Sequence, residues 1–251
     1  MYIQMEEKKH RKISKFKIAL LLVFCIFLVM GVAFGIYVSQ YYHGQHTLTE
    51  YQKNYKIDIT EENSVITLKG DTDNGIGIIF YPGGKVEYTA YIPLLAELAE
   101  QGYDCYIPKM PCNLAVFGVN RADDVIADHP DVKEWYLAGH SLGGAMASSY
   151  AAKNSDKLTG IIFLGAYPAS DISQSRLSML SIVGTKDQVV NREKYETSKS
   201  MAPQGAVYKT LDGGNHADYG DYGAQKGDGE ATITREEQIQ QTAEWIKAFC
   251  K

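Results

Sequence analysis

Residues 139–144 read Gly139-His140-Ser141-Leu142-Gly143-Gly144, and the prediction of the fold starts from this hexapeptide. The apolar run 135–138 before it predicts a strand, and the small residues from Ala145 onward predict a helix. A Gly-x-Ser-x-Gly sequence at such a junction is typical of a nucleophile elbow, a sharp turn that strains the serine backbone and exposes its hydroxyl. The hexapeptide therefore makes Ser141 the candidate nucleophile.

A purely structural interpretation of the hexapeptide is also open. The glycines would then only let a strand and a helix approach closely, and Ser141 would be the N-cap of that helix. The rest of the chain bears on this choice, because a serine nucleophile needs a base and an acid at the same edge of the sheet.

Strands and helices alternate on both sides of the elbow. Apolar runs predict strands at 56–59, 65–68, 76–81, 103–108, 134–138, 158–164, 177–183 and 206–211. Helical periodicity predicts helices at 91–102, 120–128, 141–154 and 192–200, and a last one that follows a capping box at 234–237 and runs to 249. This alternation predicts an α/β fold with a doubly wound, mostly parallel sheet.

Ligands bind such a sheet beyond the carboxyl ends of its strands, and this rule sorts the candidate partners of Ser141. His216 follows the last strand and lies at the same edge, whereas His129 precedes the elbow strand and lies at the opposite edge. Asp187 follows the preceding strand at the shared edge and would orient the imidazole, with a turn or N-cap role as its structural alternative. Asp171, which also follows a strand of that edge, is the alternative acid.

From residue 76 to residue 249 the chain resembles the α/β-hydrolase family, in particular its small, cap-less bacterial fold-5 group, and more distantly dienelactone hydrolases. The order Ser141…Asp187…His216 is that of nucleophile, acid and histidine in this family. Beside the elbow, the stretches that carry the resemblance are 81–86, 108–111, 184–187 and 214–217. The resemblance implies a serine hydrolase that cleaves a carboxylic ester or related acyl bond through an acyl-enzyme. Dienelactone hydrolases have cysteine where this chain has serine, so their substrate is not carried over.

The resemblance also implies an oxyanion hole formed by two backbone N–H groups. One is expected from Leu142 and one from Gly84 in the loop after the third strand, with the adjacent Lys85 as its alternative. It implies neither a cofactor nor a metal, and the acidic segment 218–230 lacks the spacing of an EF-hand loop. An acyltransferase that uses the same triad, and a non-catalytic binding module of the same fold, are the alternative functions.

Residues 18–38 carry no charge and are long enough to span a bilayer as a helix. Six basic and two acidic residues precede them, so the positive-inside rule predicts a cytoplasmic N-terminus and an extracytoplasmic domain at the cell membrane. A cleaved signal peptide and a buried core helix are alternatives, but the apolar core is long and has no polar face. We therefore expect a basic segment at 1–17, an anchor at 18–38, a polar stalk at 39–55 and the α/β-hydrolase domain at 56–251.

The overall charge and the cysteines complete the expectations. A net charge of −5 gives no reason to expect a nucleic-acid partner, so the predicted partners are the membrane and a small-molecule or lipid-like acyl substrate. Cys105 and Cys112 are close enough in sequence to form a disulfide in an oxidising exterior. A buried free thiol is the alternative for Cys105.

Overall fold

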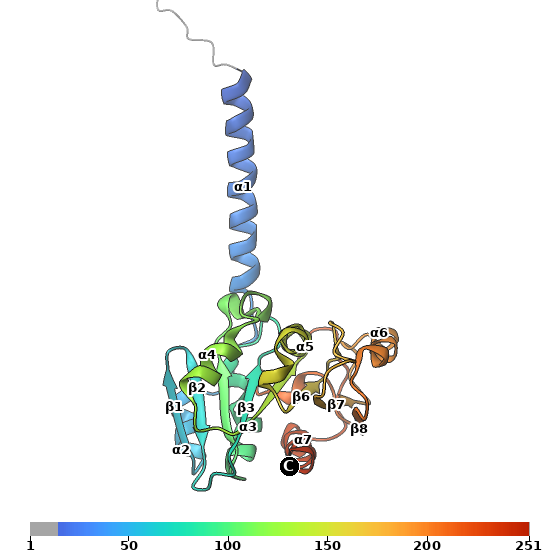
Figure 1. The fold of residues 1–251 in the computed structure, drawn as a ribbon. Coiled ribbons are helices and arrows are strands. Elements are labelled where there is room, and N and C mark those ends of the chain that lie inside the picture. Colours follow the sequence, from blue (N-terminus) through green and yellow to red (C-terminus); the bar gives the residue numbers. More distant parts are fainter. Residues whose placement is uncertain (1–14, 251) are drawn as a thin grey trace, which may run out of the picture. The chain divides into compact units, whose positions relative to one another are not determined.

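The computed structural model describes residues 15–250, and these form two compact units with a boundary between Gln40 and Tyr41 (Figure 1). The first unit contains helix α1 (Lys15–Ser39). In the part of the chain that the structure describes, α1 is the one helix that is long and apolar enough to cross a membrane, over Ala19–Ser39. Most of the basic segment predicted at 1–17 lies outside the described residues.

The second unit is built on a sheet of eight strands within residues 41–250, in the order β1-β2-β4-β3-β5-β6-β7-β8. The strands are β1 (Asp58–Glu62), β2 (Val65–Lys69), β3 (Ile76–Tyr81), β4 (Asp104–Pro108), β5 (Glu134–His140), β6 (Gly160–Leu164), β7 (Ser178–Gly184) and β8 (Val207–Leu211). The pairs from β4 through β3 to β8 are parallel, while β2 pairs antiparallel with both β1 and β4. The predicted α/β fold with a mostly parallel sheet is confirmed.

Helices cover both faces of the sheet. The α-helices of this unit are α2 (Leu48–Asn54), α3 (Ile92–Ala99), α4 (Arg121–Asp128), α5 (Leu142–Asn154), α6 (Arg192–Thr197) and α7 (Arg235–Phe249). Side chains of α3 and α7 belong to one buried apolar cluster, and those of α4 and α5 belong to another. The capping box predicted for α7 is present, because Thr234 Oγ1 accepts the N–H of Glu237 and the Glu237 carboxylate accepts the N–H of Thr234.

The segment predicted as a polar stalk differs from that expectation, because the folded unit begins at Tyr41. The backbone N–H of Tyr42 donates to the carbonyl oxygen of Lys85, and α2 begins at a capping box on Thr47. Tyr51 on α2 is 2% exposed and donates its hydroxyl proton to Asp221 Oδ2 at 2.6 Å. A polar composition alone did not reveal that this tyrosine packs into the apolar cluster of α3 and α7.

The predicted disulfide is not formed, because Cys105 and Cys112 are both free thiols. Cys105 lies on β4 and its side chain is buried in the apolar core, whereas Cys112 is exposed on the short 3₁₀ turn Pro111–Asn113. Burial raises the pKa of the Cys105 thiol well above its ordinary value. This cysteine therefore packs as a small apolar side chain.

Candidate active site

Ser141 stands at the junction of β5 and α5 with a backbone conformation that is rare for any residue other than glycine. Its φ is 51° and its ψ is −121°, and its N–H donates to the carbonyl oxygen of Leu164 at 3.0 Å. A strained backbone conformation of this kind persists only where the surrounding structure imposes it. In a nucleophile elbow this conformation exposes the serine side chain at the top of the turn.

The glycines around Ser141 are needed because strand, helix and neighbouring loop meet there. A Cβ atom on Gly139 would lie 2.6 Å from the backbone of Gly143, and one on Gly143 would lie 2.0 Å from the carbonyl oxygen of Tyr81. A Cβ on Gly144 would lie 2.5 Å from Cβ of Ala166. The elbow is thus packed directly against the end of β3 and the loop that follows β6.

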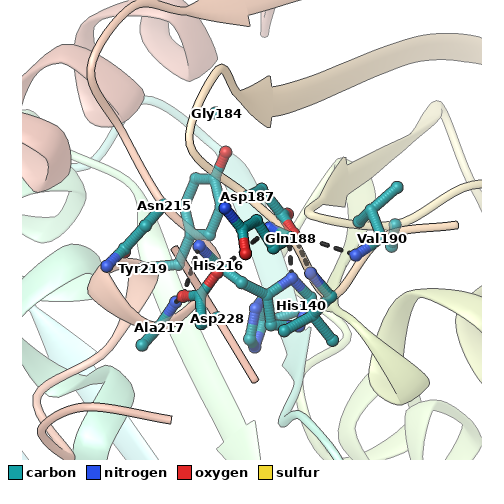
Figure 2. A network of polar contacts seen from close by, with 12 residues as sticks. His140, Gly184, Asp187, Gln188, Val190, Asn215, His216, Ala217, Tyr219 and Asp228 are labelled. Carbon is teal, nitrogen blue, oxygen red and sulfur yellow. Dashed lines mark hydrogen bonds and ion pairs between the residues drawn. The ribbon is translucent and has the colours of Figure 1, made fainter. Parts of the chain in front are cut away.

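His216 and Asp187 lie in the loops after β8 and β7, and they form a buried hydrogen-bonded pair (Figure 2). Nδ1 of His216 lies 2.9 Å from Oδ2 of Asp187, and the two side chains are at most 1% exposed. The pair fits tightly against the end of β6, where Gly165 has a φ of +50° and a Cβ would lie 2.8 Å from Nδ1 of His216. No sequence pattern pointed to this glycine.

Ser141 and His216 line one small cavity of about 100 Å³. Nε2 of His216 is buried and has no hydrogen-bond partner among residues 15–250, so it is available to take a proton. The remaining lining residues are small or apolar, except for the phenol of Tyr167: Ala145, Gly165, Ala166, Tyr167, Val189 and Val190.

The loop that carries Asp187 is held by its own carboxylate. Oδ1 of Asp187 accepts the N–H groups of Val189 and Val190, each at 2.9 Å, while Oδ2 faces His216. Arg192 Nη2 donates to the carbonyl oxygens of Gly184 and Asp187 at 2.7 and 3.0 Å. The acid is therefore fixed in position by contacts on both of its oxygens.

Asp171 is placed differently from Asp187. It is exposed, and its Oδ1 accepts the N–H of Ser173 at 2.9 Å. Hydrogen bonds from the backbone and the side chain of Ser173 lower the pKa of the Asp171 carboxyl. Asp187 is therefore hydrogen-bonded to His216, whereas Asp171 forms a hydrogen bond within its own turn.

Gly84 and Leu142, the two expected oxyanion donors, lie next to each other. A Cβ on Gly84 would come 2.9 Å from Cδ2 of Leu142, and neither residue's N–H donates a hydrogen bond to a described residue. Leu142 is the first residue of α5, where backbone N–H groups are free and the helix dipole favours negative charge. The N–H of Lys85 is already bonded to the carbonyl oxygen of Asn113 at 2.7 Å, which favours Gly84 over Lys85.

Asp228 is a further residue of this site, and sequence reasoning missed it (Figure 2). Its Oδ2 accepts the N–H groups of His216 and Ala217, both at 2.8 Å, and its Oδ1 accepts the N–H of Gln188 at 3.2 Å. One carboxylate thereby joins the histidine loop to the acid loop. Asp228 belongs to the acidic segment 218–230, whose spacing does not match an EF-hand loop.

Gln238 on α7 fixes the same histidine loop from the other side. Its side-chain amide accepts the N–H of Asn215 at 3.0 Å and donates to the carbonyl oxygen of Asn215 at 2.9 Å. Because Gln238 is fully buried, this pair of hydrogen bonds ties His216 to the last helix.

His140 is a second buried histidine, and its ring centroid lies 4.5 Å from that of His216. Burial, and then the proximity of His216, lower the pKa of His140 well below its ordinary value. His140 is therefore neutral at physiological pH. Its neutral ring does not compete with His216 for positive charge.

A comparison with protein-family models matches residues 77–240 to the model described as the alpha/beta hydrolase family. No curated protein sequence is a significant match.

Solved structures with the same fold include hydrolases of low sequence identity. A predicted CIB-like hydrolase from Thermoplasma acidophilum has a TM-score of 0.56 at 18% identity, over 76% of this chain and 99% of its own. Naproxen esterase from Bacillus subtilis has a TM-score of 0.59 at 11% identity, over 81% and 95% of the two chains. A bacterial membrane phospholipase A has a TM-score of 0.58 at 11% identity, over 93% and 97%.

Proposed function

The chain belongs to the α/β-hydrolase family, and from that premise we propose that it is a membrane-anchored serine hydrolase that cleaves a carboxylic ester. Ser141 would be the nucleophile, His216 the general base and Asp187 the acid. The observation that carries this proposal is the shared cavity: the strained Ser141 and the unpaired Nε2 of His216 both line it, and Nδ1 of His216 is bonded to a buried carboxylate.

The arrangement supports a two-step reaction. Nε2 of His216 accepts the proton of Ser141 Oγ as the oxygen attacks the acyl carbonyl carbon, and Asp187 stabilises the imidazolium that forms. The negative charge on the carbonyl oxygen is stabilised by the N–H groups of Leu142 and Gly84. The imidazolium then protonates the departing alcohol. Water, deprotonated by the same histidine, releases the acid, so the chemistry needs no metal or organic cofactor.

The size and lining of the cavity support a short, uncharged acyl group. A cavity of 150 Å³ suffices for a benzene molecule, so about 100 Å³ holds an acyl chain of a few carbons. Apart from His216 the lining side chains carry no titratable group other than the Tyr167 phenol, so a charged acyl group would lose its hydration without a partner. The alcohol part of the ester would extend toward solvent.

The anchor supports a location at the cell membrane. The helix over Ala19–Ser39 has the length of a membrane span, and the basic residues before it favour a cytoplasmic N-terminus. The hydrolase domain would then be extracytoplasmic.

The test uses residues 39–251 as a soluble protein with a fluorophosphonate probe and p-nitrophenyl esters of two to twelve acyl carbons. We expect labelling and hydrolysis of the short esters, and loss of both in Ser141→Ala. Ser173→Ala is the control, because Ser173 is a half-buried serine outside the cavity. A wild-type protein that neither labels nor hydrolyses any of these esters would contradict the proposal.

A further inference from the structure

A hydrogen-bonded chain joins the nucleophile elbow to the loop of the expected oxyanion hole. The backbone N–H of Gly83 donates to the hydroxyl oxygen of Tyr91 at 3.0 Å. The same hydroxyl lies 2.8 Å from Nδ1 of His140, which directly precedes Ser141. The reaction outlined above assigns no role to either Tyr91 or His140.

The Tyr91 hydroxyl has two hydrogen-bond partners. Its oxygen accepts the N–H of Gly83, and in the second hydrogen bond the tautomer of His140 decides whether the hydroxyl or Nδ1 is the donor. Tyr91 and His140 are both 0% exposed, so no water competes for these hydrogen bonds.

The packing around Gly83 shows how closely the two segments are joined. A Cβ on Gly83 would lie 2.8 Å from both Nδ1 of His140 and the hydroxyl of Tyr91. Gly84 follows at once and contacts Leu142, which follows Ser141. The chain Gly83–Tyr91–His140 therefore ends at the residue before Gly84 and at the residue before Ser141, close in sequence to both N–H groups that would bind the oxyanion.

We propose that Tyr91 and His140 are positioning residues that hold the Gly84 N–H in line with the Leu142 N–H, so that the two donors meet one oxyanion. This inference rests on the proposed serine-hydrolase function and adds to it two residues that touch neither substrate nor the reacting atoms. The hydrogen bonds stabilise the transition state because they fix a donor before charge develops on the substrate.

The effect should appear in the transition state and not in substrate binding. Misalignment of one oxyanion donor lowers kcat. KM reports ground-state contacts with the substrate, and neither Tyr91 nor His140 makes such contacts. Loss of a whole donor costs roughly 10²- to 10³-fold in kcat, so a displaced donor should cost roughly 10- to 100-fold.

The central variant is Tyr91→Phe in residues 39–251, assayed with a short p-nitrophenyl ester and with a trifluoromethyl ketone that Ser141 converts to a tetrahedral adduct. We expect kcat and the affinity for the ketone to fall by the same factor, roughly 10- to 100-fold, with KM changed less than about threefold.

Tyr81→Phe is the matched control. The Tyr81 hydroxyl is also buried, and it likewise accepts a backbone N–H, that of Ala122, and donates to the carbonyl oxygen of Val119. Its hydrogen bonds secure the start of α4, away from the oxyanion loop. We expect Tyr81→Phe to lower the melting temperature without changing the ratio of ketone affinity to KM.

A double variant tests whether Tyr91 and His140 act as one unit. Tyr91→Phe/His140→Phe should lose no more kcat than the more damaging single variant, because either change already breaks the chain. Additive losses, or a Tyr91→Phe protein with wild-type kcat and ketone affinity, would overturn the proposal while leaving the hydrolase function intact. An inactive wild-type protein would instead contradict the hydrolase function itself.

Discussion

The carboxylate of Asp228 accepts the backbone N–H of His216 at 2.8 Å, so the expected catalytic histidine is fixed through its main chain as well as through its ring. The same carboxylate accepts the N–H of Gln188, next to the expected catalytic acid. Two loops that are about thirty residues apart in the chain are thereby set in register by one side chain.

Replacement of Asp228 should therefore reduce catalysis through geometry. We expect Asp228→Ala to lower kcat by roughly 10²-fold, because a displacement of the histidine by about 1 Å has a cost of that order. The measurement is steady-state hydrolysis of a short p-nitrophenyl ester. Glu230→Gln is the control, since Glu230 is an exposed carboxylate on the same segment. Equal kcat in Asp228→Ala and wild type would show that the other contacts of the loop suffice.

The choice between the two candidate acids can be tested by exchanging carboxylate for amide. Asp187→Asn should keep the fold and lose on the order of 10⁴ in kcat, as removal of the acid does in serine proteases, because the imidazole then adopts the wrong tautomer. Asp171→Asn should retain full activity, since that carboxylate is exposed and bonds only within its own turn. A large loss in Asp171→Asn alone would reassign the acid.

Membrane topology can be tested on the exposed thiol of Cys112. Cys105 and Cys250 are buried and Cys25 lies within α1, so a membrane-impermeant maleimide should react with Cys112 in intact cells. Cys112→Ser should abolish this labelling without loss of esterase activity. Labelling that requires permeabilised cells would place the domain in the cytoplasm.

Acid should destabilise the protein through His140. Its pKa is lowered well below the usual 6.5 in the folded state, so below about pH 6.5 the unfolded chain binds a proton that the folded protein does not. The free energy of unfolding should then fall as the pH decreases, with a contribution of up to about 1.4 kcal/mol per pH unit. Urea unfolding between pH 5 and 7.5 should show a shallower slope for Tyr91→Phe/His140→Phe. An unchanged slope would mean that His140 titrates alike in both states.

The segment 41–55 should be required for stability. Tyr51→Ala should lower the free energy of unfolding by about 3–5 kcal/mol, the range for removal of a large buried ring. The substitution also removes the hydroxyl that donates to Asp221. Tyr208→Ala, which removes a ring that is 36% exposed, should cost much less. Equal melting temperatures for chains that begin at residues 41 and 56 would contradict this role.

The features that could be predicted from the sequence are those that depend on local pattern and on topology. Ser141 was recognisable because a Gly-x-Ser-x-Gly sequence at a strand–helix junction is demanded by the close packing that Gly139 and Gly143 allow. His216 and Asp187 follow from the rule that parallel strands present their carboxyl ends at one edge. No distance between side chains was needed for these inferences.

The remaining features depend on contacts between segments that have no sequence signature. Asp228 reads as one more acidic residue in a polar loop, and its role arises only from the backbone N–H groups it meets. Tyr51 lies in a polar stretch, and its burial depends on Asp221, 170 residues away. The disulfide between Cys105 and Cys112 was predicted from their short separation in the sequence. That separation does not reveal that the side chain of Cys105 on β4 is buried in the core.

Few residues separate the end of α1 at Ser39 from the start of the folded unit at Tyr41, and under the proposed anchoring this short linker would limit where the enzyme can act. With α1 in the membrane, the domain would not sample the bulk phase, and its reach would be about its own diameter, roughly 40 Å. Its turnover would then follow the surface density of substrate at the bilayer and not the concentration in the medium. A protease would find almost no extended chain at which to release the domain.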